Sequence, residues 1–427
     1  MSTSERPRAV LIAVKLPDVD EALLTASLDE FERLVTTLGY QVVARLVQAR
    51  SSLSPAAVLG EGKLKELAEL TGADATDDEP AETGATPKVE LVAVDHDLSP
   101  SQLRNLERAA GTDVLDRTGV IIEIFHRHAR SREARLQVEI ARLSYDVPRL
   151  RESPRGRERQ RGRGAGEAGL ELDRRRVRDR IAELRAQLDA IQKEQGVRRA
   201  RRKDVRRVAL VGYTNAGKSS LMRGLTGSDV YVEDKLFATL DTTVRAIQPE
   251  TRPRIVVSDT VGFIKKLPHD LVASFKSTLD EALEADLLLH VVDAADPEWD
   301  NQRQVTRQIL AEIGADEIPT QLVMNKSDQL SAEALQALRH AEPAAWFVSA
   351  RAPEGLATVR QGIIEFFESR YEEAEILVAY SEQRFVSELH ELGRVLEERY
   401  EDDGVRVRVR SDRETLDRVR SRLGRRT

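Results

Sequence analysis

The chain has 427 residues, enough for about three domains at the usual size of roughly 150 residues each. Only 4% of the residues are aromatic and none is cysteine, which excludes disulfide scaffolds, thiolate metal sites and cysteine nucleophiles. The net charge is −7, yet residues 149–207 hold 21 basic and 10 acidic side chains, a local +11 that favours a polyanionic partner. A solvated charged helix is the alternative explanation for this block.

Residues 1–115 alternate short apolar runs with amphipathic stretches, which is the pattern of a small α/β domain. Strands are predicted at residues 9–15, 40–48, 89–95 and 112–116. Helices are predicted at about 29–38, at about 63–70, and from Pro100, where Ser99 can cap the first turn. Residues 71–88 have almost no large apolar side chain and are predicted to be a disordered loop.

Residues 116–205 predict an antiparallel helical hairpin with a basic loop. A helical pattern runs from about 119 to 143, and a second apolar seam follows a 4-3-4-3 spacing from Val177 to Ile191. The connection at residues 149–169 is predicted to be a mobile cationic loop, with arginines that can follow RNA phosphates. A solvated linker is the alternative. These arginines are Arg151, Arg155, Arg157, Arg159, Arg161 and Arg163.

Two further domains are predicted, at residues 206–370 and 371–427. In the first, strands are expected at residues 208–211, 255–258, 287–292, 321–324 and 346–348. The second reads as a small α+β domain with a strand, a helix at about 382–400, a strand at 405–410 and an arginine-rich helix. No apolar run approaches the ~20 residues that span a bilayer, and the first ten residues lack a signal-peptide core. We therefore expect a soluble cytoplasmic protein.

The strongest motif follows the predicted strand 208–211. Residues 212–219, GYTNAGKS, fill the G-x-x-x-x-G-K-[ST] pattern of a phosphate-binding loop between a strand and a helix. Lys218 should reach the β- and γ-phosphates, and the Ser219 hydroxyl should ligate Mg²⁺. The predicted nucleotide contacts of this loop are Gly212, Tyr213, Thr214, Asn215, Ala216, Gly217, Lys218, Ser219 and Ser220.

Three more motifs follow predicted strands, and together they make the predicted nucleotide site specific for guanine. Asp259 should hold the Mg²⁺ shell, and the N–H of Gly262 should contact the γ-phosphate. In the sequence Asn325-Lys326-Ser327-Asp328, the last carboxylate can accept two hydrogen bonds from guanine N1 and N2. Ser349 and Ala350 would supply an N–H for guanine O6. The four motifs in this order, each at a strand end, predict GTP as the ligand and GDP as the product.

Residues 235–245 form a candidate switch segment with three threonines. Thr239 is the preferred Mg²⁺ ligand, while Thr242 and Thr243 remain alternatives whose presence strand propensity explains almost as well. The predicted metal ligands are thus Ser219, Thr239 and Asp259, and the predicted catalytic residues are Lys218, Thr239 and Gly262.

With these motifs the chain resembles the HflX family of ribosome-associated GTPases, which is related to the Obg group. The matching segments are residues 98–107, 116–125, 135–150, 166–181, 236–245 and 259–279. The resemblance implies a Ras-like P-loop GTPase domain after a small α/β domain and a helical hairpin. It also implies Mg²⁺-dependent hydrolysis of GTP and a partner in the large ribosomal subunit and its rRNA. The implied role is the splitting or rescue of ribosomes under stress, with a fraction of the molecules bound to ribosomes. We expect the protein to be a monomer.

Two departures from the family pattern concern the loop between the hairpin helices and the switch. Arginines replace the usual glycine-rich turn, and Asp241-Thr242-Thr243 stands where Asp-Pro-Thr is usual. Phe263 follows Gly262 where Ras has its water-orienting Gln, so we expect slow hydrolysis that a partner accelerates. Asn215 stands where several related GTPases help to hold K⁺, although satisfying loop amides would explain it equally well.

Two other functions remain open. The first is an Obg-like GTPase that acts on immature ribosomal subunits, and the second is an RNA-binding scaffold in which GTP is structural. The presence of both Mg²⁺ anchors, Ser219 and Asp259, favours a hydrolysing switch over the scaffold.

Overall fold

The computed structural model describes residues 6–53, 58–73, 89–149, 165–200, 205–227, 236–237, 243–265 and 281–424. The described residues up to Ile191, with Leu236 and Phe237, form one compact unit, and the other described residues from Gln192 onward form a second. No helix in these ranges is long and apolar enough to cross a membrane.

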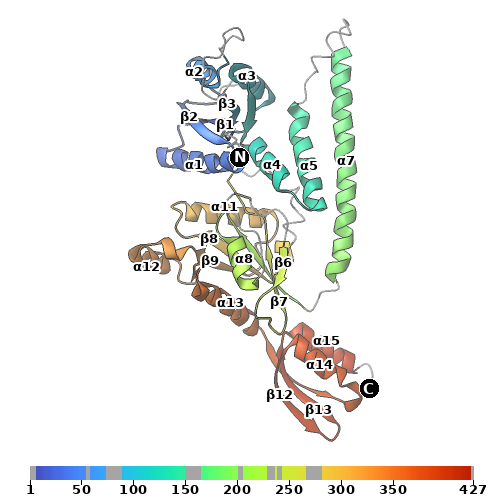
Figure 1. Ribbon diagram of the computed structural model, residues 1–427. Helices are drawn as coiled ribbons and strands as arrows, with labels where there is room; N and C mark the ends of the chain where they lie inside the picture. The colour runs from blue at the N-terminus through green and yellow to red at the C-terminus, as the bar shows by residue number, and fades with distance from the viewer. Residues whose placement is uncertain are drawn as a thin grey trace, which may run out of the picture. The chain divides into compact units, whose positions relative to one another are not determined.

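A four-stranded parallel sheet lies at the centre of the first unit, in the order β2-β1-β3-β4 (Figure 1). The six residues Ala9 to Val14 are all buried, because helices cover both faces of the sheet. The strands are β1 (Arg8–Lys15), β2 (Gln41–Ala49), β3 (Val89–Val94) and β4 (Asp113–Asp116). The helices are α1 (Glu21–Thr37), α2 (Glu61–Thr71) and α3 (Pro100–Ala110).

The starts of two helices in this unit test the predictions that were made from capping residues. Ser99 caps α3 as predicted, and the Gln102 side chain closes a capping box. In contrast, α1 begins at Glu21, about eight residues before the predicted start. Asp20 caps it by accepting a hydrogen bond from the Leu23 N–H at 2.6 Å.

The predicted hairpin is present, but its first half is two helices rather than one. Residues Arg117–His128 form α4 and Arg132–Asp146 form α5, since Ser131 caps a new helix by accepting from the Ala134 N–H. A 3-10 turn at Val147–Arg149 follows α5. The long helix α7 covers Ala165–Ala200, so residues 165–169 are helical where a loop was predicted. The predicted arginines at 151–163 lie outside the described residues.

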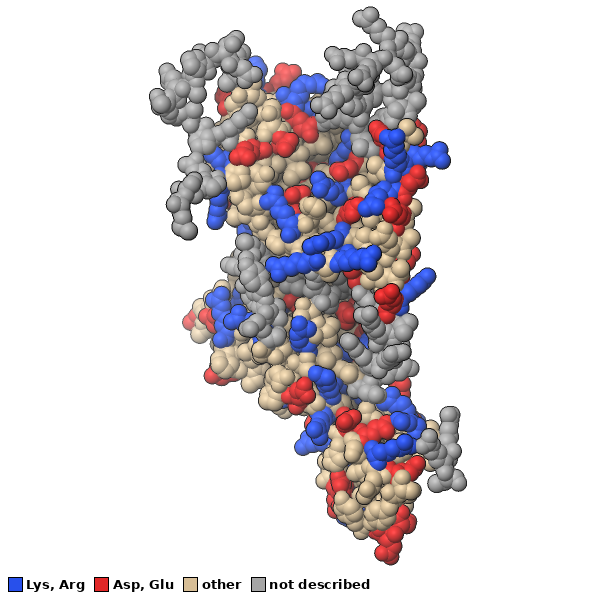
Figure 2. Space-filling model, turned by 45° about the vertical axis from the view of Figure 1, so that its right-hand side comes forward, with Lys and Arg blue, Asp and Glu red and all other residues tan. Residues whose placement is uncertain are grey.

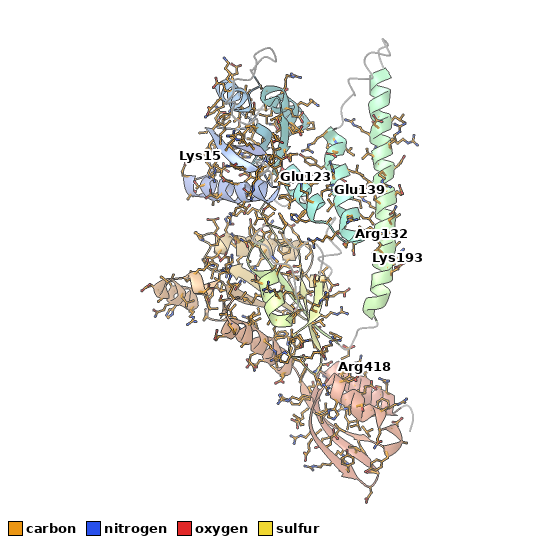
Figure 3. All side chains as sticks on the ribbon, in the orientation of Figure 1. Lys15, Glu123, Arg132, Glu139, Lys193 and Arg418 are labelled. Carbon is orange, nitrogen blue, oxygen red and sulfur yellow. The ribbon has the colours of Figure 1, made fainter. Side chains whose placement is uncertain are left out.

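Helices α5 and α7 run antiparallel and share an apolar seam (Figure 1). Leu136 and Ile140 of α5 pack against Ile181 and Leu184 of α7, which confirms the predicted pairing. Outside the seam, basic and acidic side chains lie close together (Figure 2), and on α7 they form exposed ion pairs such as Arg176–Asp173 and Arg178–Glu171. Glu139, labelled in Figure 3, extends from α5 toward α7 and pairs with Arg180. Such exposed pairs add little stability.

The second unit begins with a six-stranded sheet in the order β10-β9-β8-β5-β7-β6. Helices α8 and α13 pack against one face, and α11 packs against the other (Figure 1). The strands are β5 (Arg206–Gly212), β6 (Thr243–Ala246), β7 (Ile255–Asp259), β8 (Leu287–Asp293), β9 (Thr320–Asn325) and β10 (Trp346–Phe347). The helices are α8 (Lys218–Thr226), α11 (Trp299–Glu312), α12 (Ala332–Ala341) and α13 (Pro353–Glu368), with a 3-10 turn at Ser327–Gln329.

All five predicted strands of this sheet are present, and β6 is additional. It pairs antiparallel with β7 at the sheet edge, opposite the side where β8 and β9 continue the parallel order. Five parallel strands with one antiparallel edge strand, packed between helices, agree with the α/β fold predicted for this domain.

A three-stranded antiparallel sheet in the order β11-β13-β12 ends the chain, with α14 and α15 packed on one face. The predicted helix at about 382–400 is wrong in its second half. Helix α14 stops at Leu392, and Arg394–Glu401 form a strand that pairs with β13 across the turn at Asp402 and Asp403. The elements are β11 (Glu372–Val378), α14 (Arg384–Leu392), β12 (Arg394–Glu401), β13 (Gly404–Ser411) and α15 (Arg413–Gly424), with a 3-10 turn at Tyr380–Glu382.

A buried ion network joins three elements of the first unit. Arg117, at the start of α4, is only 1% exposed and pairs with Glu30 of α1 and with Asp95, 2.7 Å away, just after β3. Because both carboxylates are also buried, removing the cation would leave two charges in a poorly polarisable environment.

We expect Arg117→Met to lower the free energy of unfolding of the first unit by about 3–5 kcal/mol, since buried ion pairs are costly to break from one side. Hydrogen exchange of the amides in β1 and β3 measures this effect. Arg180→Met, which breaks an exposed pair with Glu139, is the matched control and should cost less than about 1 kcal/mol. Equal protection in the two variants would contradict the assignment.

Candidate nucleotide-binding site

The described motif residues meet at one edge of the second unit's sheet. Gly212, Asp259 and Asn325 end the strands β5, β7 and β9, and Ser349 follows β10 closely. Because these strands are parallel, their carboxyl ends lie side by side, which is where open α/β sheets hold ligands.

The phosphate loop needs glycine at its two ends. A Cβ atom on Gly212 would lie 2.1 Å from the Val291 carbonyl oxygen, and one on Gly217 would lie 2.1 Å from the Asn325 side-chain nitrogen. Both glycines have positive φ values, of 146° and 95°. Between them, Asn215 has a φ of 60°, a conformation that Asn tolerates better than most residues. The loop is thus held tightly against neighbouring strands.

Lys218 opens helix α8 and points back over the loop. Its Nζ donates to the carbonyl oxygens of Gly212 at 3.1 Å and Tyr213 at 2.8 Å. Burial lowers the pKa of Lys218 to about 8, and the nearby Asp259 charge opposes that shift. An anion beside the ammonium group would favour its charged form, so the position is suited to phosphate oxygens.

Ser219 and Asp259 provide adjacent oxygen atoms next to this lysine. The Ser219 hydroxyl donates to Asp259 Oδ2 at 2.7 Å, and Asp259 is fully buried. Hydroxyl and carboxylate oxygens are ligands that Mg²⁺ prefers, so the two residues fit the predicted metal site. Thr243 lies directly opposite Asp259 in β6, while Thr239 and Thr242 lie outside the described residues.

Gly262 lies close to the lysine, as a shared contact with one phosphate group requires. A Cβ atom added to Gly262 would be 3.0 Å from Lys218 Nζ and 2.8 Å from the Thr214 Cα. Any side chain at this position would therefore fill the space in front of the phosphate loop.

Asn325 links the phosphate loop to the predicted base-binding loop. Its Nδ2 donates to the Ala216 carbonyl at 2.8 Å, and its Oδ1 accepts from the Ala350 N–H at 2.9 Å. The side chain is only 1% exposed. Asn325 thus ties together three motifs that are far apart in the sequence.

The remaining base-site residues lie around this link. Asp328 is exposed on the 3-10 turn after β9, and Ser349 is buried, with its Oγ accepting from the Arg351 N–H. Lys326 has a φ of 59° and pairs with Asp293, 2.6 Å away at the end of β8. Sequence reasoning missed Asp293, although a carboxylate at the end of a buried strand was the available signal.

Three family models match consecutive parts of the chain. The model described as GTP-binding GTPase N-terminal matches residues 25–126, and GTP-binding GTPase Middle Region matches residues 128–202. The model described as 50S ribosome-binding GTPase matches residues 207–326.

Relatives match over nearly the whole length of the chain. GTPase HflX of Gluconacetobacter diazotrophicus is 55% identical over 440 residues, covering 98% of each chain. GTPase HflX of Escherichia coli is 41% identical over 392 residues, covering 90% of this chain and 89% of the relative. A GTP-binding protein from Sulfolobus solfataricus, solved with GDP, is 24% identical with a TM-score of 0.45, covering 84% of this chain and 98% of that one. The identity to the two bacterial relatives, over nearly their full length, shows that the chain belongs to the HflX family and is a GTP-hydrolysing enzyme.

Proposed function

We propose that this GTPase is a switch that binds the large ribosomal subunit and splits or rescues ribosomes under stress. It works in the cytoplasm as a monomer, with a fraction on ribosomes. The observation that supports the nucleotide part is the meeting of Lys218, the Ser219–Asp259 pair and Asn325 at one sheet edge. The match to a 50S ribosome-binding GTPase model over residues 207–326 supports the ribosomal part.

The proposed protein has four domains. They are an N-terminal α/β domain at residues 1–115, a hairpin at 116–205, the GTPase domain at 206–370 and a C-terminal domain at 371–427. The hairpin supplies the RNA contact. On the described part of α7 many arginines already pair with acidic neighbours, so the arginines at 151–163 are the proposed phosphate contacts.

In the active site, Lys218 and the Gly262 N–H contact the γ-phosphate, and the phosphate-loop amides hold the β-phosphate. Ser219 and Asp259, with Thr239 from the switch segment, are the proposed Mg²⁺ ligands. A Mg²⁺ ion held by these residues would offset the negative charge of the phosphates. The buried lysine and the adjacent Ser219–Asp259 pair suit hydrolysis better than a purely structural GTP.

Base selection rests on Asp328 in this proposal. The carboxylate accepts from guanine N1 and N2, and a backbone N–H of the Ser349–Ala350 loop contacts guanine O6. Asn325 acts indirectly, by holding the loop of Ala350 and the phosphate loop at a fixed separation.

An Obg-like role in subunit assembly is the second candidate. A sucrose gradient distinguishes the two functions: GTP-dependent loss of intact ribosomes supports splitting, whereas binding confined to immature large subunits supports assembly.

Asp328→Asn should lower GDP affinity by about 2–4 kcal/mol and raise affinity for xanthosine diphosphate, since it removes the charged acceptor for guanine. Isothermal titration measures both affinities. Asp316→Asn makes the same charge change at an exposed position in the loop before β9 and is the matched control. If Asp328→Asn binds GDP like the parent, this residue does not read the base.

Large ribosomal subunits should raise the steady-state rate of phosphate release by about tenfold or more, because Phe263 cannot orient water and a partner must complete the site. Small subunits at the same concentration provide the control. An unchanged rate with large subunits would count against the switch.

Hydrolysis should be about tenfold or more faster in KCl than in NaCl at equal ionic strength if Asn215 helps to hold K⁺, because a cation placed like an arginine finger stabilises transition-state charge. Asn215→Gly keeps the positive φ but removes the side-chain oxygen, so it should abolish the preference for KCl. Equal parent rates in the two salts would rule out this role.

A further inference from the structure

Residues 260–265, which follow Asp259, continue along the phosphate loop instead of leaving the sheet. The Phe263 N–H donates to the Gly212 carbonyl at 3.1 Å, and the Phe263 carbonyl accepts from the Thr214 N–H at 2.8 Å. Phe263 is 2% exposed and Ile264 is fully buried. These contacts extend the β5–β7 pairing past the end of both strands.

One side chain of the phosphate loop makes a third contact with this segment. The Tyr213 hydroxyl accepts a hydrogen bond from the Lys265 N–H at 2.7 Å, and Tyr213 is only 4% exposed. Lys265 is itself held by an ion pair with Glu298, 2.9 Å away, at the entry to α11. The nucleotide site uses only the backbone of Tyr213, so the proposed phosphate contacts do not explain this side chain.

The three hydrogen bonds lie on the carboxyl side of Gly262 and restrain its position. Because Phe263 and Lys265 are attached to the phosphate loop, Gly262 stays in the space beside Lys218 Nζ. Among the described residues, no acceptor is found for the backbone N–H of Gly262. A donor held in place before the ligand arrives loses little entropy when it binds.

We propose that Tyr213 is a positioning residue for GTP hydrolysis: its hydroxyl holds residues 260–265 so that the Gly262 N–H and Lys218 face the same γ-phosphate. The proposal rests on the proposed roles of Gly262 and Lys218. It predicts that the hydroxyl matters for nucleotides with a γ-phosphate and hardly matters for GDP.

Tyr213→Phe keeps the buried ring and removes the hydroxyl that accepts from the Lys265 N–H. We expect GDP affinity within about twofold of the parent, because the phosphate-loop backbone is unchanged. The affinity for a non-hydrolysable GTP analogue and the single-turnover rate of GTP hydrolysis should each fall by about tenfold, the effect of one buried hydrogen bond. Tyr380→Phe removes a hydroxyl bond to the Glu401 carbonyl in the C-terminal domain and should change neither quantity.

The same hydrogen bond can be tested by removing its donor, the backbone N–H of Lys265. Lys265→Pro removes the N–H donor and should reproduce the pattern of Tyr213→Phe, and the double variant should be no slower than Lys265→Pro alone. Lys265→Ala keeps the N–H and should slow hydrolysis less than Lys265→Pro.

Equal losses of GDP and GTP-analogue affinity in Tyr213→Phe would overturn the proposal, since they would mean that the hydroxyl only maintains the loop. Unchanged hydrolysis in Tyr213→Phe would overturn it as well. A parent protein that binds neither nucleotide would instead contradict the proposed site itself, so the two failures can be told apart.

Discussion

The nucleotide site depends on one buried amide, the side chain of Asn325. Its nitrogen holds the Ala216 carbonyl and its oxygen holds the Ala350 N–H, so one planar group sets the separation of the two loops. The close approach also explains Gly217, where a Cβ atom would lie 2.1 Å from the Asn325 nitrogen. Losing either hydrogen bond would leave buried polar groups unsatisfied, which costs about 1–3 kcal/mol each. Asn325 therefore holds the phosphate loop and the Ala350 loop at a fixed separation.

The phosphate end is organised around buried charge. Lys218 lies among backbone carbonyls with Asp259 nearby, and burial lowers the lysine pKa to about 8. Phe263, which occupies the place of a water-orienting residue, has its ring buried and both backbone groups bonded to the phosphate loop. Its phenyl ring has no polar atom with which to orient water.

The contribution of the other ion pairs to stability depends on whether they are buried or exposed. Arg117, at the start of α4, pairs with two buried carboxylates, on α1 and just after β3, and each would be left unpaired without it. The ion pairs on α7 and across the C-terminal sheet, such as Arg408–Glu373, are exposed, and water screens them. The high content of charged residues, 33%, therefore bears on solubility and association more than on stability.

The sequence by itself determined the strand-end motifs, the cap of α3 at Ser99 and the apolar seam of the hairpin. Each of these features depends on residues that lie close together in the chain. The family was identified from longer segments such as residues 98–107, 135–150 and 259–279. The strand Arg394–Glu401 was missed, since its partner β13 decides its conformation more than its own propensity does. Only the tertiary structure brought Asn325 to Ala216 and the Tyr213 hydroxyl to Lys265, because hydrogen bonds between residues 109 and 52 positions apart leave no local pattern.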